Sequence, residues 1–148
     1  MKTILLVFSL ICFWHTGNGQ AIPQKGRIAI TFKKANNVND IIKQYPVLTE
    51  LLSDIEETDI YFAKAKIGST SFLFVRFEGI LYRGTEGTPL IVFMDTGSGY
   101  KQVLDVTTQS DITLSDKSPP VIYLRSRTGK TTAWEYDQRM KQYRLHKK

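Results

Sequence analysis

From residue 59 onward, the chain is a series of short apolar or alternating segments separated by Gly, Pro, Asp and Ser. Segments such as "IYFAKAKI" and "SFLFVRF" have the β-branched and aromatic content that is typical of strands. The gaps between them are too short for helical crossovers, so we expect neighbouring strands to pair antiparallel. The further predicted strands are "GILYRG", "PLIVFMD", "YKQVLDVT", "DITLS", "PVIYLRS", "TTAWEYD" and "QYRLHK".

The residues before this series predict one more strand and a helical part. "RIAITFKK", residues 27–34, predicts a first strand. Residues 38–55 change to helical spacing, and Pro46 divides them into two short helices or one kinked helix, with Asn37 or Asn39 as a cap. The expected fold is therefore α+β. An N-terminal strand and one or two short helices pack on a curled, mostly antiparallel sheet of about seven to nine strands.

The first residues have the layout of a secretory signal peptide. Lys2 supplies a positive charge, an apolar run follows, and small residues extend to Ala21. The expected signal is residues 1–19, with cleavage after Ala21 as the alternative. Residues 22–148 are then expected to form a single α+β domain, because no linker or low-complexity stretch divides them.

The predicted signal also removes the only cysteine of the chain. Cys12 lies within the apolar run, and Ile11 before it is too large for a lipoprotein cleavage site. We therefore expect an exported protein, periplasmic or secreted, without a lipid anchor, a transmembrane segment or a disulfide. His146 is then the only histidine, which disfavours His-dependent triads and His-rich metal sites. The carboxylates within residues 54–59 match no calcium loop, so neither a metal nor a cofactor is predicted.

The charge indicates which partners to expect. The chain has 20 basic and 14 acidic residues, a formal net charge of +6. Such a surplus favours an anionic envelope component, such as an acidic polysaccharide or lipopolysaccharide, or an acidic protein; an exported chain is not expected to bind nucleic acid. Trp134, Tyr136, Arg139 and Tyr143 combine aromatic rings with cations and are the predicted contact residues. The competing interpretation places Trp134 and Tyr136, which share one strand face, in the core.

"IVFMDTGSG", residues 91–99, is the stretch most similar to an active site. Its apolar run and Asp95-Thr-Gly-Ser resemble the loop of retroviral-type aspartic proteases, in which two aspartates share a proton across a homodimer. The glycine-rich flap of that family has no counterpart after Gly99. Ser98 and Lys101 also match the Ser-x-x-Lys of penicillin-recognising enzymes, which are much longer. The favoured interpretation is a hairpin loop, and the alternative is a homodimeric protease that uses Asp95.

A second stretch supports the hairpin interpretation. "WEYDQRMKQYRL" repeats the order of "VFMDTGSGYKQVL": apolar residues, Asp, a turn, then Tyr and a basic residue. The second copy has no catalytic feature, whereas Asp readily opens turns because its side chain bonds the backbone two residues on.

Four motifs, two of them from the repeated pattern, carry a resemblance of the second half of the chain to other domains. They are "GTEGTPLIVFM", "TGSGYKQVL", "PPVIYL" and "WEYDQRMKQYRL", which together span residues 84–145. In these motifs the chain resembles a group of small exported bacterial domains of uncertain function. The resemblance implies an exported β-rich fold and no activity. The expected function is therefore that of a non-enzymatic binding protein, inhibitor-like or envelope-associated.

Overall fold

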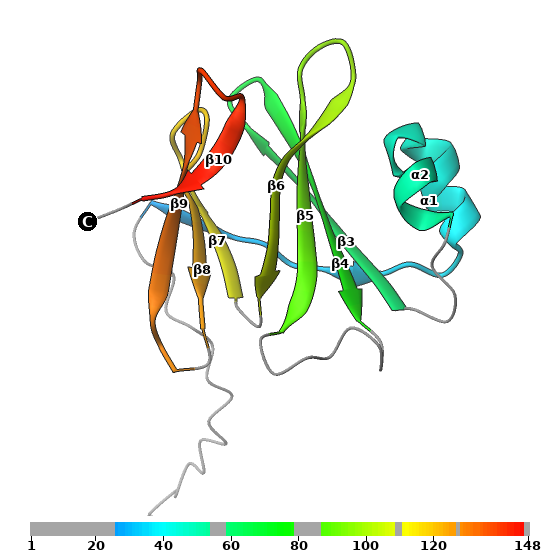
Figure 1. The fold of residues 1–148 in the computed structure, drawn as a ribbon, viewed down its shortest axis with the longest axis horizontal. Coiled ribbons are helices and arrows are strands. Elements are labelled where there is room, and N and C mark those ends of the chain that lie inside the picture. The colour runs from blue at the N-terminus through cyan, green and yellow to red at the C-terminus, as the bar shows by residue number, and fades with distance from the viewer. Residues whose placement is uncertain (1–25, 54–58, 79–86, 109–110, 127, 147–148) are drawn as a thin grey trace, which may run out of the picture.

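A computed structural model describes residues 26–53, 59–78, 87–108, 111–126 and 128–146. These ranges are mostly β, with two short α-helices and one 3₁₀ turn between the second and third strands (Figure 1). The predicted signal at residues 1–19 and the strand predicted for "GILYRG" lie outside the described residues.

The elements, in chain order, are β1 (Arg27–Ala29), β2 (Lys33–Lys34), α1 (Val38–Gln44), η1 (Pro46–Leu48), α2 (Thr49–Leu52), β3 (Asp59–Ile67), β4 (Thr70–Glu78), β5 (Thr88–Asp95), β6 (Tyr100–Thr108), β7 (Asp111–Ser115), β8 (Ile122–Arg125), β9 (Thr131–Asp137) and β10 (Gln142–Leu145).

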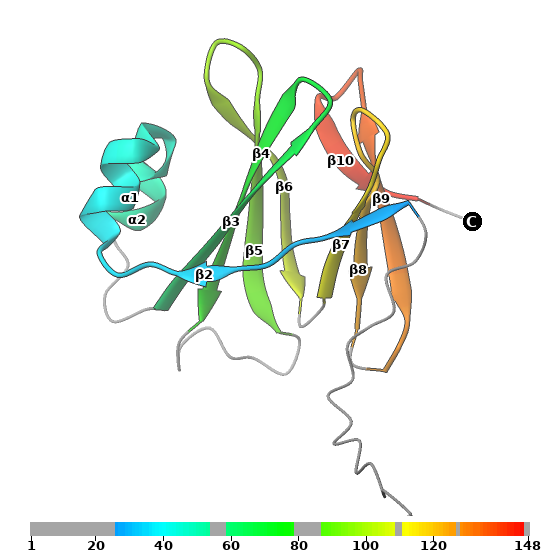
Figure 2. The ribbon, with the colours of Figure 1, turned by 180° about the vertical axis from the view of Figure 1, so that it is seen from behind.

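The strands form two antiparallel sheets of five strands each, and not the single curled sheet of seven to nine strands that the sequence predicts. One sheet has the order β1-β7-β8-β9-β10, and the other has the order β2-β3-β4-β5-β6. The difference arises in residues 27–34, which are expected as one strand. This segment instead crosses from the edge of one sheet to the edge of the other, and β1 and β2 are its two paired ends (Figure 2).

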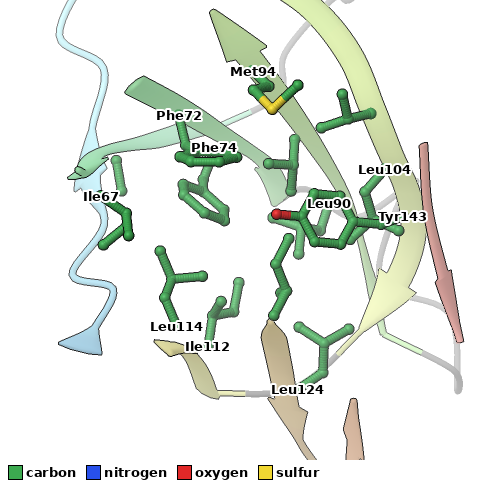
Figure 3. Packing of buried hydrophobic residues seen from close by; sticks show 14 residues of the cluster. Ile67, Phe72, Phe74, Leu90, Met94, Leu104, Ile112, Leu114, Leu124 and Tyr143 are labelled. Atoms are coloured by element: carbon green, nitrogen blue, oxygen red, sulfur yellow. The ribbon is translucent and has the colours of Figure 1, made fainter. Parts of the chain in front are cut away.

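The larger core fills the space between the two sheets. Side chains alternate between the two faces of a strand, and Phe72, Phe74 and Leu90 of the second sheet point into this space. They meet Leu114 of the first sheet, and all four are fully buried (Figure 3). Burial of each such side chain stabilises the fold by about 1.5–3 kcal/mol. The two sheets are therefore held together mainly by apolar contact.

The helices cover the other face of the second sheet. Leu73 and Phe93 point to this face and pack with Ile41, Leu48 and Leu52 of the helical segment. Strands β4 and β5 are thus covered on both faces, by the helices on one side and by the first sheet on the other (Figure 1). This double burial explains why their sequences are nearly continuous apolar runs.

The helical segment follows the sequence-based prediction. Asn37 is the N-cap of α1, and its Oδ1 accepts the backbone N–H of Asn39 at 2.9 Å. Pro46 begins η1, where its missing N–H costs no helical hydrogen bond. The prediction of one or two short helices on one sheet face is confirmed, and the structure has two. Asp59 begins β3 and pairs with Lys34 of β2 at 2.8 Å, while the other acidic residues of that run lie outside the described residues.

Candidate functional site

The hairpins β5–β6 and β9–β10 lie at the same end of the molecule, at the mouth of the space between the sheets (Figure 1). A cleft of about 400 Å³ lies between them and is lined by residues of both hairpins. This volume is within the range of small-molecule binding sites. The hairpins that line the cleft are the two that share the order apolar residues, Asp, turn, Tyr and base.

Asp95 has a structural role in the β5–β6 loop. Its Oδ1 accepts the backbone N–H of Gly97 at 2.9 Å, and the backbone N–H of Thr96 donates to the Gly99 carbonyl at 3.0 Å. Gly97 and Gly99 have φ values of +82° and +122°, which favour glycine. The prediction that this stretch connects two strands as a hairpin loop is confirmed.

Asp95 also lies on the opposite face of the hairpin from the cleft. It pairs across the ladder with Tyr100, which packs on the helix-covered face, whereas the next pair, Met94 and Lys101, lines the cleft. Burial, followed by the negative charge of Asp95, raises the pKa of Tyr100.

Asp137 has the corresponding role in the β9–β10 turn. Its Oδ1 accepts the backbone N–H groups of Arg139 at 2.9 Å and Met140 at 3.1 Å, and Arg144 Nε lies 3.5 Å from Oδ2. The Met140 N–H is the main cause that lowers the pKa of Asp137, with smaller contributions from Arg139 and Arg144. Both aspartates of the repeated pattern therefore hold turns.

Two lysines from different hairpins line the cleft. Lys101 is on β6, and Lys141 is the last residue of the β9–β10 turn before β10 begins. Both are exposed. No Asp or Glu lines the cleft within the described part of the chain, and no ion pair between described residues engages either lysine. The cleft is therefore a concentration of positive charge without an internal counterion.

The remaining lining residues divide into hydrogen-bonding and apolar groups. Hydroxyls and a side-chain amide come from the two loops, and an apolar floor comes from the strands. Val103 belongs to the floor because a β-bulge in the β5–β6 ladder turns both Val103 and Leu104 inward. The polar group is Thr96, Ser98 and Gln138, and the floor is Met94, Val103 and the half-buried Tyr136.

The four predicted contact residues have different positions. Tyr143 is in the core, where it is 5% exposed and its hydroxyl donates to the Pro120 carbonyl at 2.8 Å; burial raises its pKa. Trp134 is half-buried against the same core, and its Nε1 has no hydrogen-bond partner among the described residues. Arg139 is exposed in the turn and does not line the cleft. Of the four, Tyr136 lines the cleft, and its ring lies 5.4 Å from that of Tyr143.

Lys141 and Gln138 were not predicted from the sequence. Ser98 was considered in the protease-like and Ser-x-x-Lys patterns and Lys101 in the latter, and neither was predicted as a binding residue. The repeated pattern was the available signal, because it marks the two hairpins that the fold places side by side. Alternation alone does not show that the single lysine of each hairpin faces the other hairpin.

The chain was compared with protein-family models, curated proteins and solved structures, and no match was found. Within the described ranges, no helix has the length and apolar character needed to cross a membrane. No group of three or more His, Cys, Asp and Glu residues is placed to hold a metal ion in the part of the chain that the structure describes.

Proposed function

We propose that the protein is an exported, non-enzymatic binding protein that holds an anionic group in the cleft between the β5–β6 and β9–β10 hairpins. One observation carries this proposal: Lys101 and Lys141 reach a single cleft without a carboxylate among its described lining residues. Like charges near one another repel, and an anion between them replaces repulsion with attraction.

The size of the cleft favours a small anionic group over a protein surface. Stable protein–protein interfaces bury about 800 Å² on each partner, whereas a cleft of about 400 Å³ suits one small ligand or one sugar unit. An anionic envelope component is therefore the preferred partner class, and the net charge of +6 supports its attraction to the protein.

The position of Asp95 supports binding in preference to proteolysis. Its carboxylate accepts the N–H of Gly97 within its own loop and lies on the face opposite the cleft. Peptidase activity that disappears in Asp95→Asn, in a protein that remains folded, would support the homodimeric protease instead.

The test compares two double variants that lose the same charge. Lys101→Gln/Lys141→Gln removes both cleft lysines, and the matched control Lys43→Gln/Lys130→Gln removes two exposed lysines that do not line the cleft. Binding to immobilised dextran sulfate and polygalacturonate is measured at physiological ionic strength, with neutral dextran as the blank. We expect the cleft variant to lose binding to at least one of the two polyanions and the control variant to retain that binding. Equal losses in both variants would show that the charge acts diffusely over the surface and that the cleft is not the site.

A further inference from the structure

We infer that the anionic group is a phosphate monoester and that the part of the ligand next to it is a ring or another apolar group. This inference rests on the proposed function and specifies the ligand of the same cleft. The phosphate lies between Lys101 and Lys141, and the apolar part lies on the floor of Met94, Val103 and Tyr136.

The number of unpaired charges favours a dianion. A phosphate monoester carries about −1.5 to −2 charges at pH 7, which matches two ammonium groups, whereas a carboxylate or a sulfate ester matches one. The two cleft lysines are unpaired within the described ranges. The ion pairs of these ranges engage other basic residues: Lys34, Arg76, Arg144 and His146.

The type of donor favours a tetrahedral group over a planar one. Arginine presents a flat fork that matches both oxygens of a carboxylate, and lysine presents a compact charge with three donors. The described lining residues include lysines, hydroxyls and one amide but no arginine, although Arg139 belongs to the same turn as Gln138 and Lys141. Separate donors on two hairpins can approach the oxygens of a phosphate from different directions.

The hydroxyls of the β5–β6 loop leave one donor for the ligand. Thr96 Oγ1 donates its only proton to the Gly99 carbonyl at 2.9 Å, so Ser98 Oγ, at 3.1 Å, is the donor to Thr96 Oγ1. Ser98 is exposed, and a hydroxyl rotates freely. Its proton can therefore turn from Thr96 to a phosphate oxygen without any change in the backbone.

The backbone at Lys141 indicates that its side chain has a role beyond the turn. Lys141 has a φ of +54°, the left-handed conformation, which costs an ordinary residue about 1–2 kcal/mol relative to glycine. Lys141 is the only non-glycine residue with positive φ among those described. Glycine would form this turn with less strain, and lysine adds a charge at the cleft.

The floor of the cleft is apolar and packed against the core. Met94 and Val103 are 9% and 3% exposed, and the edge-on contact with Tyr143 holds the Tyr136 ring in place. A ring attached to the phosphate can cover the exposed part of this floor, mainly the half-buried Tyr136, and this strengthens binding relative to inorganic phosphate.

The test measures the affinities of four probes for the intact protein by calorimetry at constant ionic strength. Phenyl phosphate has the charge, shape and ring that the cleft requires; phenyl sulfate keeps the shape with one charge, benzoate is planar, and inorganic phosphate lacks the ring. We expect phenyl phosphate to bind about tenfold more tightly than each of the other probes. Each of them lacks either a charged hydrogen bond or the ring that covers the apolar floor, and one such contact accounts for a difference of this size.

Three single variants connect the affinity to the cleft. Lys101→Gln and Lys141→Gly are each expected to weaken phenyl phosphate binding about tenfold, and Lys130→Gln to leave it unchanged. Lys141→Gly serves as a folding control, because glycine relieves the strain at φ +54° and its thermal midpoint should equal or exceed that of the parent protein.

The possible failures are distinguishable. If phenyl sulfate or benzoate binds as tightly as phenyl phosphate, the phosphate assignment is wrong and the proposed anion cleft stands. If inorganic phosphate equals phenyl phosphate, the assignment of the apolar floor is wrong. If no probe binds in the millimolar range, the inference that the ligand is a phosphate monoester is wrong. The polyanion assay then decides separately whether the cleft binds anions. If the probes bind but neither cleft variant weakens them, both proposals fall.

Discussion

The hydroxyl of Tyr143 fastens the β9–β10 hairpin to the rest of its sheet. It donates to the carbonyl of Pro120, which precedes β8, so the bond reaches past β9 to the next strand. Both residues are buried, and the side chain of Pro120 is fully so. Tyr143→Phe removes this one donor and keeps the ring and its contact with Tyr136.

The magnitude at neutral pH follows from two contributions. A typical hydrogen bond contributes about 1 kcal/mol to stability, and the Pro120 carbonyl left without its donor in a buried site raises the cost to about 1–3 kcal/mol. No large cavity forms, because only an oxygen is removed. We therefore expect the free energy of unfolding of Tyr143→Phe to be about 1–3 kcal/mol lower at pH 7.

Alkaline pH provides an independent measure of the same group. Burial raises the pKa of Tyr143 in the folded protein, whereas an unfolded tyrosine ionises near pH ~10. As pH rises, Tyr143 therefore loses its proton first in the unfolded state. Its contribution to the free energy of unfolding is fully present below about pH 10 and decreases as pH rises toward the folded pKa. The decrease is about 1.4 kcal/mol per pH unit, and phenylalanine shows none of it. Tyr100, whose pKa is also raised, is present in both proteins and cancels in the comparison.

Urea denaturation of the two proteins, followed by tryptophan fluorescence and far-ultraviolet circular dichroism, measures both effects. We expect the parent protein to have a higher free energy of unfolding than Tyr143→Phe at about pH 7. This difference should become smaller by about 1 kcal/mol or more at about pH 11. Equal midpoints at neutral pH would show that the hydroxyl is not needed in the core. A gap that stays constant at alkaline pH would show that Tyr143 ionises in the folded protein as easily as in water.

Three further predictions concern the two loops. Asp95→Asn can still accept the Gly97 N–H and should change the unfolding free energy by less than about 0.5 kcal/mol, whereas Asp95→Ala should lower it by about 1 kcal/mol; equal stabilities would refute the turn role. Gly99→Ala should lower it by about 1–3 kcal/mol because of the φ of +122°, and an unchanged thermal midpoint would contradict the loop geometry. Backbone donors lower the pKa of Asp137, so its stabilisation is present above the unfolded pKa near ~4 and decreases as pH falls through the folded value. Asp137→Ala should therefore lose less stability on acidification than the parent protein, and identical acid unfolding profiles would argue against this role.

The sequence predicts the strands well because their signals are local. Alternation, turn residues and the proline at position 46 locate the helical pair and the strands from β3 to β10 within the described ranges. The number of sheets is not a local property. Residues 27–34 have one continuous strand-like composition, and only pairing with β7 at one end and β3 at the other divides them.

The cleft is less predictable than the strands because it depends on residues that are distant in the sequence, and local patterns do not show which of them meet. Lys101 and Lys141 are far apart in the sequence, and the packing of the sheets brings them to one cleft. Aromatic residues near a positive charge point to a surface, but Tyr143 has a buried hydroxyl with a carbonyl partner that no pattern reveals. Of the aromatic group, Tyr136 reaches the cleft because it lies near the end of β9, where the sheets open.

The crossing segment that carries β1 and β2 has a consequence for the order of folding. β3 to β6 pair in succession as neighbours along the chain, and so do β7 to β10. In contrast, β1 pairs with the distant β7 and with no other strand among those described, so Arg27 meets Ser115. Pairing β1 with β7 closes a much longer loop than any hairpin turn does, so it costs more conformational entropy and is slower than the formation of successive hairpins. The successive hairpins β3–β6 and β7–β10 should therefore form first, and β1 should join the edge of its sheet last. Until β7 has been synthesised, β1 is an unpaired edge, and chains interrupted before that point are expected to associate through it.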